Sequence, residues 1–514
     1  MSKSLFSEIR NDLPASIVVF FVAVPLCLGI ALASGAPLFS GIIAGIIGGI
    51  VVGVASGSSL GVSGPAAGLA VIVLTSIASL GSYETFLAAV VIAGVLQLIL
   101  GFAKAGFVAY FFPSSVIKGM LTGIGLLIII KQIPHALGWK ALINSENAGT
   151  QDVSAAGTGI SDIWNYVTPG AVLIAVISLA ILILWDSVLI KKHKIFQLIQ
   201  GPIVVVILGI VFSNLFASGA LNFTLAKEQL VSLPVPSGLN DFFTQFTFPD
   251  INAIYNPEVW KIAVILAIVA SLETLLSVEA TDKIDPDKGV TPTNRELKAQ
   301  GLGNIFSGLI GGLPVTQVIV RSSANISFGG KTKASTILHG IFLLISALTI
   351  AGLLNMIPLA SLATILLMVG YKLAKPSLFI KAYKAGWEQF IPFIATVIAI
   401  LASDLLKGIT IGILFGIFYE LRHSYRNSHV KDIVTTENNL NVHHITLAEE
   451  VSFFNKASIH QDLNSIPPDS KVIIDGRRSK SIAQDVLELI EDFTINAKTK
   501  NIRVEVINLH KKEK

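Results

Sequence analysis

A run of 71 residues without a single Asp, Glu, Lys or Arg, from Leu13 to Tyr83, constrains the fold more than any other feature of this sequence. Over all 514 residues, 53% of the side chains are hydrophobic and only 14% are charged, whereas roughly a quarter are charged in soluble domains. So little polar surface cannot cover so much apolar surface in water. The sequence therefore predicts an α-helical protein of the lipid bilayer, not a soluble enzyme, a disordered chain or a disulfide scaffold.

The charged residues gather at the C-terminal end of the chain. Residues 425–514 hold 26 of them and the preceding 424 residues hold 44. This uneven distribution predicts a cytoplasmic N-terminus over residues 1–12, a membrane domain over 13–424 and a soluble cytoplasmic domain over 425–514. The net charge of +4 is too small to predict a nucleic-acid surface, and no signal peptide is expected, because the polar N-terminus leads into a full-length apolar run.

Fourteen apolar segments are candidates for crossing the membrane, for which a helix needs about 20 residues. They are Leu13–Ala33, Phe39–Val54, Pro65–Leu80, Phe86–Phe102, Phe107–Ile130, Pro169–Leu184, Gly201–Phe216, Ile262–Val278, Leu302–Leu313, Val315–Phe328, Thr336–Leu354, Leu359–Tyr371, Phe390–Leu401 and Ile409–Phe418. The third and tenth are short and begin next to a proline. This count predicts a multi-pass protein of the cell membrane.

Basic residues in the loops orient these segments, because cytoplasmic loops are rich in Lys and Arg. They follow the even-numbered segments, at Lys191, Lys192, Lys194, Lys283, Lys288, Arg295, Lys331, Lys333, Lys381, Lys384, Arg422 and Arg426. Lys131 and Lys140, after the fifth segment, are exceptions. On balance, the pattern places both termini in the cytoplasm.

The two short segments indicate an internal symmetry. Each is the third of seven segments, one in a repeat over about residues 13–216 and the other in a repeat over about 257–424. Interrupted hydrophobic segments at matching places in two halves are typical of an inverted repeat with a binding site at the midplane. The alternative is a pair of ordinary helices kinked by proline.

Two such half-helices would direct free backbone N–H groups and positive dipole ends at one point, an arrangement that favours an anion. The candidate amides are those of Ala66 and Ala67 on one side and of Ile319 and Val320 on the other. Thr316 and Gln317 could add side-chain donors. No charged side chain is required for this mode of binding.

Two charged residues stand out within the membrane domain. Glu273 lies roughly 18 Å along its helix from Lys261, at a depth where a charge costs on the order of 3 kcal/mol. Ser277, one turn later on the same face, could join Glu273 in holding Na⁺, or the carboxylate alone could carry a proton. Arg321 would strengthen anion binding, since its guanidinium matches an oxyanion; the alternative is an ion pair between Arg321 and Glu273.

The remaining polar residues predict little chemistry. His339 fits a hydrogen-bonded interior histidine or, less readily, a proton relay. No catalytic constellation, resident metal site, cofactor site or nucleotide-binding GxxxxGK[ST] motif is found. The sequence therefore predicts neither an enzyme nor an ATP-driven pump.

Two motifs resemble the sulfate permease (SulP) family of inorganic anion transporters. VSGPAAGLAVIVL (62–74) is similar to that family's third-helix segment, and TNRELKAQGLGNIFSGLIGGLPVTQVIVRSSANISFGGKTKASTILHG (293–340) is similar to its signature from the ninth to the eleventh helix. The resemblance implies a seven-plus-seven inverted repeat divided into core and gate domains, a homodimer, and an anion bound between the third and tenth helices.

The resemblance also implies roles for individual residues. Glu273 matches the family's acidic position for Na⁺ or H⁺ coupling, Ser277 matches a hydroxyl position one turn later, and Arg321 matches a basic position of the tenth helix. Where many relatives carry Pro-Gly-Ala-Gly, this chain has Pro-Val-Thr-Gln at 314–317.

After the membrane domain, strand-like segments at Val442–Val451, Lys471–Asp475 and Ile502–Ile507 enclose a helix-like segment at Ser481–Phe493. This α/β pattern resembles a short STAS domain.

The leading hypothesis is a secondary transporter of a small inorganic oxyanion, sulfate or bicarbonate, in symport with Na⁺ or H⁺ by alternating access. The main alternative is an uncoupled anion exchanger or channel on the same scaffold. A nucleobase carrier and a membrane-anchored regulator acting through the STAS-like domain are further alternatives.

Overall fold

The computed structural model describes residues 8–106, 113–139, 167–189, 200–403, 405–426, 429–435 and 441–509. The predicted cytoplasmic residues Lys191, Lys192 and Lys194 lie outside these ranges, as does the exception Lys140. Contacts divide the chain into two units, Met1–Ile380 with Thr396–Ile409 and Lys381–Ala395 with Thr410–Lys514.

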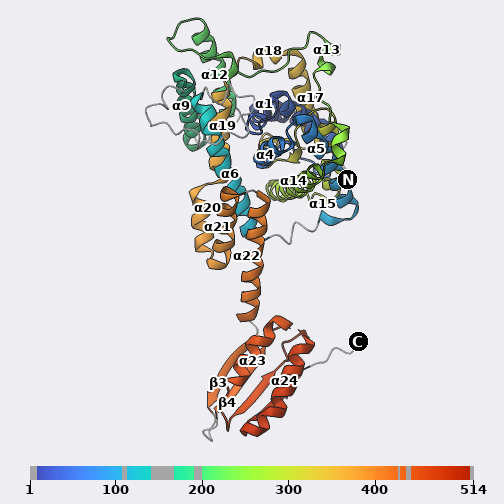
Figure 1. Cartoon of the computed structure of the whole chain (residues 1–514), viewed down its shortest axis with the longest axis vertical. Coiled ribbons are helices and arrows are strands. Elements are labelled where there is room, and N and C mark those ends of the chain that lie inside the picture. Colours follow the sequence, from blue (N-terminus) through green and yellow to red (C-terminus); the bar gives the residue numbers. More distant parts are fainter. Residues whose placement is uncertain are drawn as a thin grey trace. The chain divides into compact units, whose positions relative to one another are not determined.

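Each of the fourteen predicted segments contains a helix (Figure 1). The first seven are α1 (Ile9–Ala33); α2 (Leu38–Ile47), continued by the π-helical η1 (Gly48–Val52) and α3 (Gly53–Ala55); η2 (Ala67–Leu69) with α4 (Ala70–Leu80); α5 (Tyr83–Phe102); α6 (Ser114–Leu137); α9 (Pro169–Leu184) with η5 (Trp185–Leu189); and α12 (Gly201–Ala217). The second seven are α14 (Pro257–Ile284), α15 (Thr293–Leu309), α16 (Ile319–Ser327), α17 (Lys333–Thr349), α19 (Leu359–Leu373), α21 (Trp387–Ala402) and α22 (Leu405–Arg426). Shorter connecting helices are η6 (Lys227–Gln229), α13 (Leu239–Thr244), η7 (Ile251–Tyr255), α18 (Ala351–Leu354) and α20 (Pro376–Lys384).

Length and composition agree with a membrane protein. In the described part of the chain, seven helical segments are long and apolar enough to cross a bilayer, and four shorter apolar helices accompany them. The predicted ninth segment is displaced: α15 begins at Thr293 and not at Leu302. Its first turns carry buried polar side chains, so hydropathy alone did not detect them.

The two halves pack in matching ways. α1 packs on α17 as α14 packs on α5, α2 packs on α17 as α15 packs on α5, and α1 packs on α16 as α14 packs on α4. In each comparison, the two contacts involve helices at the same positions in the two halves: α1 corresponds to α14, α2 to α15, α4 to α16 and α5 to α17. The predicted seven-plus-seven repeat is thus visible in the contacts.

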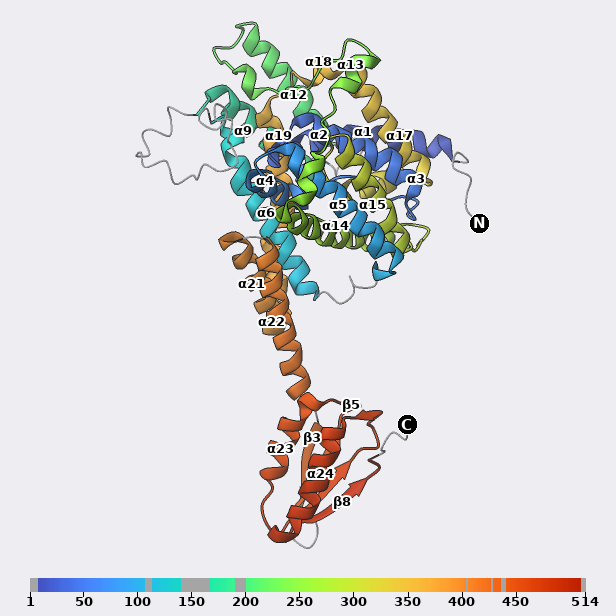
Figure 2. The same ribbon diagram turned by 45° about the vertical axis from the view of Figure 1, so that its right-hand side comes forward.

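The helices of the first unit form two groups. α1, α2, α4, α5 and α14 to α17 pack around one another, and α6, α9, α12 and α19 form a second group beside them (Figures 1 and 2). This arrangement corresponds to the expected core and gate. α1 and α4 contact α6, so the start of the third segment lies near the boundary between the groups.

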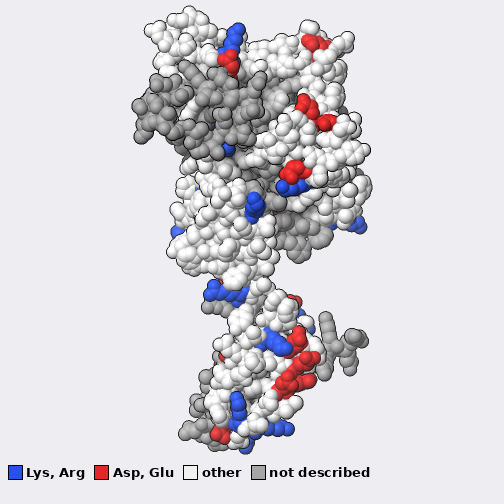
Figure 3. Space-filling model, viewed as in Figure 1, with Lys and Arg blue, Asp and Glu red and all other residues white. Residues whose placement is uncertain are grey.

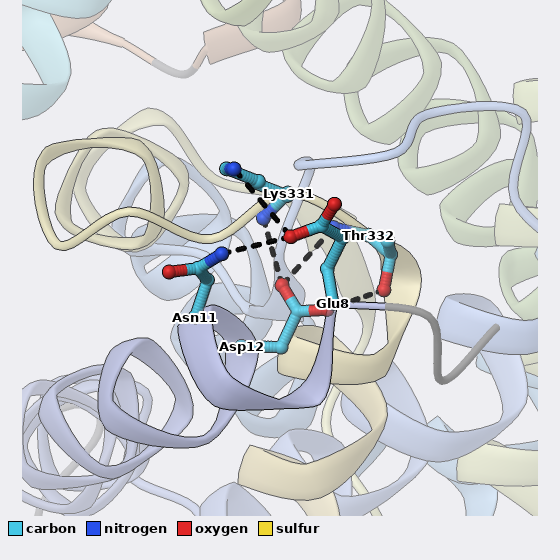
Figure 4. Close-up of polar contacts among 5 residues, drawn as sticks. All are labelled: Glu8, Asn11, Asp12, Lys331 and Thr332. Carbon is cyan, nitrogen blue, oxygen red and sulfur yellow. Dashed lines mark hydrogen bonds and ion pairs between the residues drawn. The ribbon is translucent and has the colours of Figure 1, made fainter. Parts of the chain in front are cut away.

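The start of α1 is fixed to the start of α17 by a buried carboxylate (Figure 4). Asp12 Oδ1 accepts hydrogen bonds from the backbone N–H groups of Lys331 (2.7 Å) and Thr332 (3.0 Å), and Asp12 Oδ2 accepts from the Thr332 hydroxyl. Glu8, one turn earlier, pairs with the Lys331 ammonium at 3.4 Å. These bonds satisfy the Asp12 carboxylate, so its burial is structural.

The C-terminal part contains a four-stranded sheet in the order β3–β4–β6–β8. The strands are β3 (His429–Thr435), β4 (Asn441–Leu447), β6 (Lys471–Asp475) and β8 (Arg503–Ile507), with a small pair of β5 (Glu450–Val451) and β7 (Ser481–Ile482). β3 is antiparallel to β4, and the other ladders of the sheet are parallel. η8 (Phe453–Asn455) and η9 (Lys498–Lys500) flank the helices α23 (Lys456–Asn464) and α24 (Gln484–Ala497).

This α/β unit is consistent with the predicted STAS-like pattern and corrects its elements. Residues 481–482, predicted as helix, form a strand, and β3 and α23 were not predicted. Ile459, Val472, Ile474 and Ile490 form its core with other apolar side chains. On the face shown in Figure 3, charged side chains are sparse over the membrane helices and gather on this part of the chain.

Candidate functional site

Two short strands cross at the centre of the core group. β1 (Ser63–Pro65) pairs antiparallel with β2 (Val315–Gln317), and all six residues are buried. Each strand directly precedes one half-helix, η2–α4 or α16. The sequence predicted that the third and tenth segments are interrupted here, but the pairing of the two strands was not predicted. It is satisfied within protein, as backbone at membrane depth must be.

The pairing places the two half-helix N-termini on opposite sides of the crossing. The first bonds recorded within each half-helix run from Leu69 N to Ala66 O and from Ser322 N to Val318 O. The amides of Ala67, Ile319 and Val320 therefore precede the first intrahelical bond and remain free to donate to a ligand. Ile319 and Val320 are 36% and 48% exposed. Their side chains are therefore not enclosed at the crossing, and it is their backbone N–H groups that could bind a ligand there.

Three glycines of the first half each leave room for one polar side chain of the second half. A Cβ atom on any of them would collide with that side chain. The pairs are Gly61 with Gln317, Gly64 with Arg321, and Gly68 with Glu273. The sequence alone did not show that the glycine spacing on one segment matches three polar side chains of the other half.

Arg321 is fully buried beside β1. A Cβ on Gly64 would lie 2.2 Å from Arg321 Nη1. The guanidinium donates through Nη2 to the Cys27 sulfur at 3.4 Å, whereas Nε and Nη1 have no hydrogen-bond partner. No ion pair joins it to a carboxylate among the residues that the structure describes, so the predicted alternative of a pair with Glu273 is not formed here.

Glu273 lies on α14 with its carboxylate against Gly68, whose added Cβ would be 2.6 Å from Oε1 and 2.7 Å from Oε2. Oε2 is enclosed and has no hydrogen-bond partner. Ser277, one turn later, is buried, and its carbonyl accepts a 2.6 Å bond from the Thr281 hydroxyl. Oε2 of Glu273 therefore stays available as an oxygen ligand, with Ser277 one turn away on the same helix.

The two predicted polar residues of β2 are both buried. The Gln317 amide donates through Nε2 to Thr281 Oγ1 at 3.2 Å, and its backbone N–H donates to Thr274 Oγ1 at 3.3 Å. Gln317 Oε1 and Thr316 Oγ1 have no partner. The structure thus brings the predicted residues of the third, eighth and tenth segments to one crossing.

A row of buried polar side chains on α15 supports the crossing. The Asn304 side chain accepts from Val315 N at 2.6 Å and donates to Val315 O at 3.1 Å, which mimics a strand partner for β2. Gln300 donates to Ser63 Oγ at 2.8 Å on β1. Glu296 accepts from the Ser56 hydroxyl and from Gln300. Their spacing of four residues placed them on one helix face, a signal that the sequence interpretation missed.

The geometry defines a class of protein: a multi-pass membrane transporter built from two related halves, with discontinuous helices that meet at a buried polar site. The model of the Sulfate permease family matches residues 9–396. The chain belongs to this family, and this membership places it among membrane transporters and not among enzymes.

Two curated relatives illustrate the similarity. The chain is 28% identical over 371 residues to the "Putative sulfate transporter YvdB" of Bacillus subtilis, a match covering 72% of this chain and 65% of that protein. It is 25% identical over 418 residues to the "Bicarbonate transporter BicA" of Picosynechococcus sp., covering 80% and 70%. The chain thus spans slightly less than two thirds of the length of YvdB.

Solved structures share the fold. The transmembrane domain of a cyanobacterial bicarbonate transporter BicA superposes with a TM-score of 0.66 at 23% identity, covering 78% of this chain and 98% of that chain. The overall structure of SLC26A9 gives a TM-score of 0.77 at 16% identity, covering 99% and 86%. The second match extends over the C-terminal α/β part as well.

Proposed function

We propose that the chain is a secondary transporter that moves a small inorganic oxyanion, sulfate or bicarbonate, in symport with Na⁺ or H⁺. The anion would bind at the crossing of β1 and β2, between the amides of Ala66 and Ala67 and those of Ile319 and Val320. The names of the relatives YvdB and BicA support these two anions. Both are small, both are rich in acceptor oxygens, and free N–H groups at helix ends suit both.

The observation that carries this proposal is the unpaired charge of Arg321. A buried guanidinium without a carboxylate is costly, and two of its nitrogens lack any acceptor. An oxyanion at the crossing would neutralise the charge and accept from Nε and Nη1. The orphan oxygen of Thr316 adds a hydroxyl that can donate to the same ligand.

The coupling ion would bind at Glu273 and Ser277. The enclosed Oε2 oxygen of Glu273 lacks a partner, and carboxylate, hydroxyl and carbonyl oxygens suit a hard cation such as Na⁺. A proton on the carboxylate would serve the same purpose. The Glu273 carboxylate lies against Gly68, which is four residues after Gly64, the residue against which Arg321 lies.

The remaining features of the proposal concern the cell and the assembly. We infer a location in the cell membrane with both termini in the cytoplasm, supported by the Lys and Arg residues after the even-numbered segments. We also infer a homodimer, as the family resemblance implies. Movement of the core group past the gate group would give alternating access.

Uptake into proteoliposomes tests the proposal. Radiolabelled sulfate and bicarbonate are supplied with and without a Na⁺ gradient and with and without a pH gradient. Accumulation should need one of the gradients, and Glu273→Gln should abolish that dependence while Arg321→Gln should abolish saturable uptake. Unchanged gradient-driven accumulation by Glu273→Gln would refute the coupling role, and anion currents independent of Na⁺ and pH would identify a channel or exchanger instead.

A further inference from the structure

His339 is a fully buried titratable residue that the proposed transport site does not use. It lies on α17 with an exposed fraction of 0%. Its Nδ1 lies 2.6 Å from the carbonyl oxygen of Thr336, and because a carbonyl can only accept, Nδ1 carries the hydrogen. The neutral ring then presents Nε2 as an acceptor, and Nε2 has no partner.

One glycine-rich face of α2 and η1 brings His339 close to the anion site. A Cβ on Gly49 would lie 2.9 Å from His339 Cε1, and a Cβ on the preceding Gly48 would lie 2.7 Å from the backbone nitrogen of Gly64. Gly64 is the residue against which Arg321 lies. Only backbone therefore separates the imidazole from the segment that holds the guanidinium.

The same face extends to the other partner of Arg321. A Cβ on Gly45, one turn before Gly49, would lie 2.7 Å from Cys27 Sγ, the sulfur that accepts from Arg321 Nη2. η1 is π-helical, a distortion frequent at functional sites. Substituting any of these glycines would force apart the elements that contact them.

The unmatched atoms around this face are complementary. Arg321 has two nitrogens that can only donate, Nε and Nη1, and His339 has one acceptor, Nε2. Two buried groups of opposite hydrogen-bonding character, each with atoms that have no partner, point to a polar function in a place where hydrogen bonding is normally complete.

Few other charges act on His339. α2, η1, α3 and α18 pack against α17. Within their described residues, these four elements contain no titratable side chain. α1 contributes Cys27, whose sulfur accepts from Arg321, and at its far end Arg10 and Asp12, the latter bound to Thr332. Arg321, on α16, is thus the dominant charge for His339, with Lys333 at the distant start of α17.

We propose that His339 binds a proton at Nε2 whenever an oxyanion occupies Arg321, so that each anion is bound together with one proton. This inference rests on the proposed function and deepens it. Without the anion, a second cation beside the guanidinium would have no counter-charge. The bound anion supplies that counter-charge, so the imidazole can take a proton from water and release it when the anion leaves.

By linkage, the coupling works in both directions. If His339 is neutral in the empty site and charged in the occupied site, acid pH strengthens anion binding. Uptake of one whole proton per anion corresponds to a tenfold change in dissociation constant per pH unit. A merely structural histidine would give no such slope.

The test measures sulfate binding to the purified full chain in lipid nanodiscs, because the charge of sulfate is constant between about pH 6 and about pH 8, the range in which histidines titrate. Calorimetry in buffers of different ionisation enthalpy gives the number of protons taken up per sulfate. For the unmodified chain we expect about one proton taken up per sulfate bound. Its affinity for sulfate should fall up to about tenfold for each unit by which the pH rises. His339→Asn, whose amide can still donate to Thr336 O, should take up none, and its affinity for sulfate should be the same at pH 6 and at pH 8.

His135→Asn is the matched control, because it removes another histidine of the membrane helices, half-buried on α6 and outside the proposed site. Its slope should equal that of the unmodified chain; loss of the slope in Glu273→Gln, with retention in His339→Asn, would overturn the inference. His339→Gln serves as a second variant if His339→Asn does not fold. An unmodified chain that binds sulfate without proton uptake refutes this inference alone, whereas one that binds neither sulfate nor bicarbonate refutes the proposed function.

Discussion

Gly64→Ala should displace the guanidinium of Arg321 without removing its charge. The new Cβ would lie 2.2 Å from Nη1 and 3.1 Å from Cζ, whereas comfortable contacts begin near about 3.5 Å. The far end of a flexible side chain must therefore retreat by more than about 1 Å. Alanine fits the backbone, since Gly64 lies in an extended strand before a proline.

The magnitude follows from the geometry of hydrogen bonds. A donor displaced by about 1 Å leaves the range of about 2.7–3.2 Å in which N–H···O bonds form. Loss of one charge-assisted bond to the anion costs about 1.5–3 kcal/mol, and about 1.4 kcal/mol corresponds to a factor of ten in affinity. We expect the dissociation constant for the anion to rise about ten- to hundredfold.

Stability should change little, since moving a side chain off its preferred rotamer costs on the order of 1 kcal/mol. Titration of the purified chain with sulfate and bicarbonate, paired with thermal unfolding, separates the two effects. Gly352→Ala on α18 is the control, because a Cβ there meets nothing within 4 Å. A folded Gly64→Ala chain with unchanged anion affinity would contradict the placement of the anion at Arg321.

Three further changes test other parts of the structure. Gly68→Ala should displace the Glu273 carboxylate, whose Oε1 would lie 2.6 Å from the new Cβ. It should weaken the Na⁺ or H⁺ dependence of uptake more than the affinity for the anion; a larger loss of anion affinity would contradict separate sites. Asn304→Ala should lower the free energy of unfolding by about 2–4 kcal/mol, because it leaves both backbone groups of Val315 unpaired, as denaturant titration would reveal. Arg477 holds the pKa of Asp475 at about 2, so this pair stabilises the α/β part above about pH 4 and the stabilisation is lost as pH falls toward 2. Arg477→Ala should remove that dependence, which limited pepsin digestion of the full chain between pH 5 and pH 2 would detect.

Much of the membrane fold was predictable because the bilayer imposes simple rules. Apolar length located most of the helices closely, although α6 ends at Leu137 and not at the predicted Ile130. A charge in the interior is costly enough to single out Glu273 and Arg321. α15 was misplaced because its buried face carries Glu296, Gln300 and Asn304. Hydropathy treats such residues as solvent-exposed, although here each bonds to protein.

The strand crossing could not be predicted from local sequence. Pairing of β1 with β2 joins residues about 250 positions apart, and three-residue strands have no periodicity to detect. The contacts of three glycines with polar side chains of the other half could not be predicted either. The chain contains 43 glycines, and nothing local distinguishes Gly61, Gly64 and Gly68 from those that pack helices.

These glycines suggest why an anion and a cation would move together. Arg321 and Glu273 come from different helices, yet both lie against one segment, at Gly64 and Gly68. Four residues span at most about 14 Å, so the two proposed sites share a short, continuous piece of backbone. Because both side chains pack against this segment, movement of the core group relative to the gate group would carry both charges together. A bound anion would also lower the electrostatic cost of the nearby cation. The proposed symport would then follow from the covalent continuity of residues 64–68, without a signal passing through the rest of the protein.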